Sequence, residues 1–134
     1  MSAYEYLCAA GLIGALLAVG TMLVQARIIG SAAVAAGLSG AFAGFSAITL
    51  YREGVVQVWS NHTANLWGVQ VWWDLLFATG TALFLILPRA RAAGMAVLPW
   101  TAFVTLTASF GLLAMAARLF WLERAREAAG TVTH

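Results

Sequence analysis

Four long apolar runs, separated by short charged segments, constrain the fold of this chain more than any other feature. A helix needs about 20 apolar residues to cross a bilayer core of about 30 Å. Runs of that length predict helices over about 6–24, 29–50, 66–87 and 96–122. Of the 134 residues, 63% are hydrophobic and 9% are charged, so the chain is too apolar to cover itself with a soluble surface. We therefore predict an all-α integral membrane protein.

The connections between the apolar runs predict how the helices are arranged. Breaks where Pro, Gly or charge interrupts the apolar pattern fall at 25–27, 51–54 and 88–94. Two connections are short, so we expect four transmembrane helices in an antiparallel bundle, as a single domain over 1–134 with a C-terminal tail over 123–134. The less apolar segment 55–65 is expected to lie at the membrane interface. An even number of spans places both termini on the same side, and the arginines do not decide which side.

Small residues recur at three- and four-residue spacing in the second apolar run. They are Ala33, Gly37, Gly40, Ala41 and Gly44, and the first run has a matching set of Gly11, Gly14 and Ala18. Because apolar area gives little net attraction between helices in lipid, close backbone contact through small residues takes its place. This face is predicted to pack on the first helix of the same chain or on the second helix of another copy. The expected partners are therefore the lipid bilayer and, in addition, a homo-oligomer or a larger membrane complex.

Polar and ionisable side chains are concentrated between residues 55 and 74. This segment holds His62, the sole aspartate Asp74 and several tryptophans. An ionisable side chain inside a span is costly unless something satisfies it. Gln70 and Asp74 are four residues apart and share one face of the third predicted helix. Arg118, at the same end of the fourth predicted helix, is the natural counter-ion, so we predict an Asp74–Arg118 ion pair that joins these two helices.

The same segment outlines a candidate binding site. The candidate binding residues are Asn61, Asn65, Trp67, Gln70, Trp72, Trp73, Asp74 and Arg118. An amphipathic molecule can stack on Trp while its polar end meets Asn, His or Asp. We expect a cavity between the third predicted helix and the loop before it, near the side that holds the termini. The favoured function is a binding or accessory membrane protein with a pocket for a lipophilic small molecule, or a subunit of a larger membrane assembly.

Two other functions fit the same residues. A cofactor-independent enzyme acting on an isoprenoid or another lipid would use Asp74 or Glu53 as the acid and His62 as the base, since His titrates near neutrality. A small oligomeric transporter would use Asp74 as its coupling residue. The sequence contains no ligand spacing typical of a metal site, no cofactor motif and no block of basic residues typical of nucleic-acid binding. We therefore predict no metal, no cofactor and no nucleic-acid partner.

The second half of the chain, over about 72–126, resembles a bacterial family of small multi-helix integral membrane proteins known only as a domain of unknown function. The resemblance rests on Asp74 opening a span, the hinge Arg91-Ala-Ala-Gly94-Met95, Trp100, Gly111 and the ending Leu119-Phe-Trp-Leu-Glu-Arg124. The family has a Pro near the end of its last span, where this chain has Ala116-Ala117-Arg118, so a straighter last helix is expected here. The resemblance implies a multi-pass protein of the bacterial inner (cytoplasmic) membrane and implies no activity.

Overall fold

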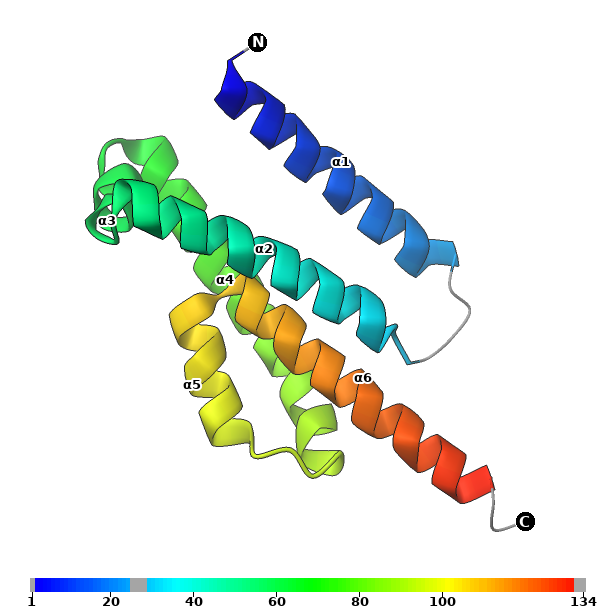
Figure 1. Ribbon diagram of the computed structural model, residues 1–134. Helices are drawn as coiled ribbons and strands as arrows, with labels where there is room; N and C mark the ends of the chain where they lie inside the picture. The colour runs from blue at the N-terminus through cyan, green and yellow to red at the C-terminus, as the bar shows by residue number, and fades with distance from the viewer. Residues whose placement is uncertain (1, 25–28, 132–134) are drawn as a thin grey trace. The chain divides into compact units, whose positions relative to one another are not determined.

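The computed structural model describes residues 2–24 and 29–131, and these ranges are almost entirely helical (Figure 1). The helices are α1 (Ala3–Val24), α2 (Ala32–Glu53), α3 (Val56–Thr63), α4 (Leu66–Ala92), α5 (Val97–Thr107) and α6 (Ser109–Thr131). Contacts divide the chain into two compact units, Met1–Gly30 with α1 and Ser31–His134 with α2 to α6. The predicted break over 25–27 lies outside the described residues.

Three helices in the described ranges are long and apolar enough to cross a membrane: α1, α2 and α4. The helix α1 has 22 residues and buries none of them within its own unit. An apolar helix of this length suits a lipid environment, because about 20 apolar residues match the bilayer core. The prediction of an all-helical chain with helices of membrane-spanning length is therefore confirmed.

Capping residues set the ends of α2. The backbone N–H of Val34 donates to the Ser31 hydroxyl at 3.3 Å, so the helix begins at Ala32 and not at the predicted residue 29. Gly54, with a φ of 78°, follows the last helical residue, and its N–H donates to the Leu50 carbonyl at 3.0 Å. The helix boundaries therefore follow the capping residues and not the edges of the apolar run.

The helix α4 continues past Pro88, although the apolar run predicts an end at residue 87. A proline inside a helix removes one backbone hydrogen bond and crowds the preceding turn, so other contacts must hold the helix beyond it. Ala90 is completely buried, and the Arg126 guanidinium donates to the Ala92 carbonyl. Gly94, with a φ of 71°, then turns the chain away. Packing on α6 therefore extends α4 by about one turn.

The fourth predicted helix, over 96–122, is not continuous. It forms α5 and α6, which meet at Ala108 with backbone angles of φ 49° and ψ −115°. An L-residue rarely adopts positive φ, at a cost of about 1–3 kcal/mol, so the surrounding packing must hold it. After this reversal α6 returns along the hairpin, and Arg126 reaches Ala92 at the end of α4. The segment is therefore a helical hairpin, and α6 continues without a break through 116–118 to Thr131.

The helix α6 forms the centre of the second unit. Its side chains Met115 and Leu119 are completely buried and belong to one apolar cluster with Val104 of α5. Ala90 of α4, with Ala93 and Met95 just after that helix, completes the buried part of this cluster. The core of the unit therefore lies where the end of α4, the start of the hairpin and the middle of α6 meet.

The helix α2 packs along α6 (Figure 1). Ala35 and Ser39 are buried there, and the Ser39 hydroxyl donates to the Phe110 carbonyl at 2.8 Å. Hydrogen bonds between membrane helices contribute about 0.6–2 kcal/mol. Gly40 and Gly44 are exposed in this unit, and a Cβ built on either would have no neighbour within 4 Å. The predicted packing of that glycine face on α1 or on another copy stays a prediction.

Gly111 of α6 packs closely against the end of α5. A Cβ there would collide with the Thr107 side chain and lie 3.2 Å from the Val104 Cα atom. Gly111→Ala should therefore lower the free energy of unfolding by about 1–3 kcal/mol, seen as a lower unfolding midpoint in detergent. Gly80→Ala is the matched control: a Cβ there has no neighbour within 4 Å, so the midpoint should stay unchanged or rise, because Ala is the better helix former. Equal midpoints for the two variants would contradict the close contact.

Candidate functional site

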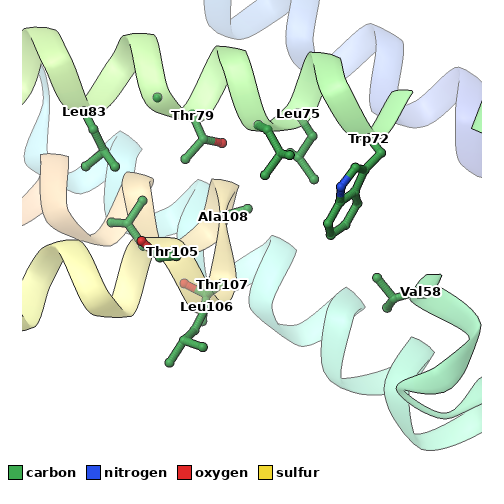
Figure 2. Close-up of a pocket in the computed structure, with 12 residues that line it drawn as sticks. Val58, Trp72, Leu75, Thr79, Leu83, Thr105, Leu106, Thr107 and Ala108 are labelled. Carbon is green, nitrogen blue, oxygen red and sulfur yellow. The ribbon is translucent and has the colours of Figure 1, made fainter. Parts of the chain in front are cut away.

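A cavity of about 380 Å³ lies between α4 and α5 and is named the α4–α5 cavity. It is lined by Val58 of α3, by Trp72, Leu75, Leu76, Thr79, Gly80 and Leu83 of α4, and by residues 104–108. The positions on α4 are three and four residues apart and therefore share one face of the helix. Figure 2 shows Trp72, Leu75, Thr79 and Leu83 projecting from α4 on the side of α5. Three helices thus contribute to one apolar opening.

The corner between α3 and α4 holds Trp72 at one end of this cavity. Asn65 caps α4 by accepting a hydrogen bond from the Gly68 N–H at 2.9 Å. A Cβ at Gly68 would lie 2.5 Å from the Asn61 carbonyl oxygen, so α3 packs directly on the backbone of α4. This contact brings the His62 ring to 5.0 Å from the Trp72 ring, edge to face. His62 therefore supports the indole, and it does not line the cavity.

The end of α5 forms the opposite wall. The Thr105 hydroxyl donates to the Thr101 carbonyl at 2.9 Å, and the Thr107 hydroxyl donates to the Phe103 carbonyl at 2.7 Å. Each hydroxyl thereby uses its only hydrogen and keeps lone pairs that can accept. A helix also leaves its last carbonyls without partners inside the helix. This wall therefore presents acceptor oxygens beside aliphatic side chains.

Gln70 and Asp74 lie on another face of α4. Asp74 follows Trp72 by two residues, which is a rotation of about 200° around a helix. Both side chains are exposed within their unit, and neither lines the cavity. The structure therefore separates Trp72, which faces the cavity, from the polar pair that the sequence groups with it.

The remaining candidate binding residues on α3 and α4 lie outside the cavity. Asn61 and Asn65 build the corner between the two helices and are exposed. Trp67 is 75% exposed, while Trp73 is 59% exposed and lies with its ring 5.8 Å from the Phe77 ring. Among the residues predicted to bind a ligand, Trp72 is the one that reaches the cavity.

The ion pair that joins α4 to α6 is not the predicted one. Arg118 is exposed, with its guanidinium 4.6 Å from the Trp121 ring, and in the described part of the chain Asp74 has no ion pair. Instead, Arg89 donates two hydrogen bonds to the Glu123 carboxylate at 3.0 and 2.7 Å. The prediction was wrong because it assumed a single fourth helix antiparallel to α4. The hairpin makes α6 parallel to α4, which moves Arg118 toward the C-terminal half of α4.

The structure does not bring the predicted acid and base residues together. Glu53 is the last residue of α2 and is exposed, and Asp74 is exposed on α4. The Nδ1 atom of His62 lies within hydrogen-bond distance of the Val58 carbonyl in its own helix. Among the residues that the structure describes, no hydrogen bond or ion pair joins any two of the Glu53, His62 and Asp74 side chains. The arrangement therefore lacks an assembled acid–base pair.

Sequence reasoning does not single out most of the cavity lining. The leucines on α4 carry no signal beyond that of an apolar helix face. Thr79 beside Gly80 within a span, and Thr105 beside Thr107, are the polar and small residues that could have marked the site. They point to a cavity only once the reversal at Ala108 places the end of α5 opposite α4.

Comparison with known proteins adds no functional information. No protein-family model, no curated protein and no solved structure matches this chain. The resemblance of residues 72–126 to a bacterial membrane family therefore stays a prediction. The function has to be argued from the cavity and from the chemistry of its lining.

Two pairs of charged residues give a matched test of how α4 and α6 are paired. In a double-mutant cycle, Arg89→Leu and Glu123→Leu should be non-additive by about 0.5–2 kcal/mol, because both remove one charge-assisted interaction. The changes Asp74→Leu and Arg118→Leu should be additive within about 0.5 kcal/mol. Unfolding in detergent measures both cycles. Coupling found only between Asp74 and Arg118 would contradict the parallel arrangement.

Proposed function

We propose that this chain is a multi-pass membrane protein that binds a lipophilic small molecule in the α4–α5 cavity. The observation that carries the proposal is the cavity itself, with a volume of about 380 Å³. Small-molecule sites span about 300–1,000 Å³ and combine an apolar lining with a few convergent polar groups. This cavity has both properties, so a ligand would lay its apolar part along α4 and turn its polar part toward the end of α5.

The lining divides into an apolar wall and a polar end. Leu75, Leu76 and Leu83 form a strip of aliphatic surface along α4. Trp72 closes one end, with Val58 of α3 on the far side of the opening (Figure 2). An indole has an apolar ring and one N–H donor, and such rings contribute much of the binding free energy in small-molecule sites. Its edge contact with His62 holds this ring in place before any ligand arrives.

The membrane arrangement proposed with this site has three crossings, by α1, α2 and α4. The α5–α6 hairpin enters the membrane and returns to the side from which it came. Its support is the parallel pairing of α4 with α6, in which Arg89 contacts Glu123 and Ala92 contacts Arg126. The two contacts are three residues apart on each helix and follow in the same order, so α4 and α6 run in the same direction. The end of α6 therefore lies level with the end of α4. Both ends then share one membrane surface, unlike in a four-span bundle.

The depth of the hairpin accounts for where the cavity lies. The helix α5 has 11 residues, which gives a length of about 16 Å, or roughly half of a bilayer core of about 30 Å. Ala108 would therefore lie near the middle of the membrane. A break in a helix is tolerated at that depth where protein covers it or where it lines a cavity. A lipophilic ligand would then enter the cavity from the lipid phase.

Cysteine labelling separates this arrangement from the predicted four-span bundle. In a Cys8→Ala background, single cysteines replace Glu53, Arg91 or Glu127 and are treated with a membrane-impermeant maleimide from one side. Three crossings with a returning hairpin place positions 91 and 127 on one side and position 53 on the other. Labelling of 53 and 127 from the same side, and of 91 from the opposite side, would contradict the proposal and restore four spans with both termini together.

Ligand binding can be tested with a photoactivatable probe, a long-chain alcohol that carries a diazirine group. In protein reconstituted into lipid nanodiscs, the probe should label peptides that contain residues 72–83 and 104–108 more strongly than peptides from the rest of α4. Gly80 lines the cavity, and a Cβ on it would have no neighbour within 4 Å. Gly80→Leu should therefore fill the cavity without disturbing the backbone and reduce this labelling at least fivefold.

The matched control is Ala78→Leu, which adds similar volume to the same helix. Ala78 is exposed and does not line the cavity, since it lies about 200° around the helix from Gly80. Labelling of the cavity peptides should be unchanged in this variant. Two results would count against a binding site. One is labelling that is spread evenly over all apolar surfaces, and the other is labelling that neither Gly80→Leu nor Ala78→Leu changes.

A further inference from the structure

We infer that the ligand of the α4–α5 cavity is an amphipathic ammonium compound, with its cationic head at the end of α5 and its apolar chain along α4. The inference rests on the proposed binding function and adds the chemical class of the ligand. Within the described chain, none of the lining residues carries a formal charge. The charge preference of the cavity is then set by helix dipoles and by the hydrogen-bonding atoms of the lining.

The helix dipole of α5 favours a cation. Residues 104–108, which form the C-terminal end of α5, line the cavity. The C-terminus of a helix carries the equivalent of about −0.5 elementary charge on its unpaired carbonyls. The N-terminal end of α6, which would favour an anion, is not part of the lining. There Gly111 packs against α5, and the Leu112 N–H donates to the Ala108 carbonyl at 2.9 Å.

The hydroxyl groups at this end are acceptors and no longer donors. Thr105 and Thr107 each donate their single hydrogen to a carbonyl in the preceding turn of α5. Their remaining lone pairs, and those of the last carbonyls of α5, can accept only. An ammonium group brings several donors and no acceptor, so it complements such a wall. A carboxylate brings acceptors alone and would meet oxygen atoms with no hydrogen between them.

Trp72 lines the same cavity and offers its indole to a cation that comes near it. A cation within about 6 Å of an indole face is stabilised by the ring quadrupole, more strongly where water is excluded. The donors that an anion could use in the lining are the indole N–H and the Thr79 hydroxyl. These few neutral donors do not offset the acceptor wall of α5. The lining therefore favours an ammonium head over a carboxylate on the same chain.

Competition against the photoactivatable alcohol tests the charge preference. Decylammonium, decanoate and decanol have the same chain and differ in the head group. In nanodiscs of uncharged lipid, decylammonium should reduce labelling of the cavity peptides at a concentration at least tenfold lower than decanoate. Charged and uncharged amphiphiles partition differently into lipid. The competitors are therefore compared at equal concentrations within the lipid, and this partitioning is measured with nanodiscs that contain no protein.

Threonine variants assign the preference to the cavity. Thr105→Val and Thr107→Val keep the side-chain shape and remove an acceptor oxygen from the end of α5, so together they should reduce the preference for decylammonium at least threefold. Thr81→Val is the control, since Thr81 is exposed and lies outside the lining. If the double variant and the Thr81→Val control show the same preference for decylammonium over decanoate, the lining threonines do not cause it, and the inference is wrong.

Two other results separate this inference from the proposed function. If decanoate displaces the probe as well as decylammonium does, the cavity binds lipophilic molecules without the inferred charge preference, and the inference is wrong while the binding function stands. If none of the three compounds reduces labelling, both the inference and the binding function are wrong.

Discussion

The contact of α6 with α5 determines how the second unit is built. Gly111 leaves room for the Thr107 side chain and the Val104 backbone of α5, and Met115 and Leu119 fill the space beside α4. If α6 moved outward, the end of α5 would lose the position from which it forms one wall of the cavity. The helix α5 covers only part of α4, and the N-terminal part of α4 extends past the end of α5. The cavity lies where this cover ends.

Where a single helix matches a single apolar run, the helix could be predicted from the sequence. The run length indicated α1, α2 and α4, and residues such as Ser31 and Gly54 explain the shifts at their ends. The reversal at Ala108 could not be predicted, because no Pro or Gly stands at that position. The contacts that hold it include the hydrogen bond from Ser39 to Phe110, whose residues are 71 positions apart. Local patterns carry no information on such a contact.

The candidate site was predicted in part for a related reason. Helical periodicity correctly groups Gln70 with Asp74 on one face, yet it does not say which face of α4 meets protein. The α5–α6 hairpin covers the face that holds Trp72, so Asp74 is left exposed on a helix of membrane-spanning length. A carboxylate in that position requires a polar partner or water that residues 31–131 do not supply at this face of α4. The residue that is most conspicuous in the sequence is thus not the one that shapes the cavity.

The strained backbone at Ala108 makes the shape of the last segment depend on its packing partners. Ala, Thr and Ser around this position are compatible with a straight helix, so the local sequence alone does not set the bend. The bend is favourable in the folded unit, where Ser39 of α2 binds the Phe110 carbonyl and α6 packs beside the end of α4. Under the proposed function, a molecule in the cavity would contact only the bent form and would shift the equilibrium toward it by mass action. Such a ligand would therefore stabilise the fold of the last segment of the chain.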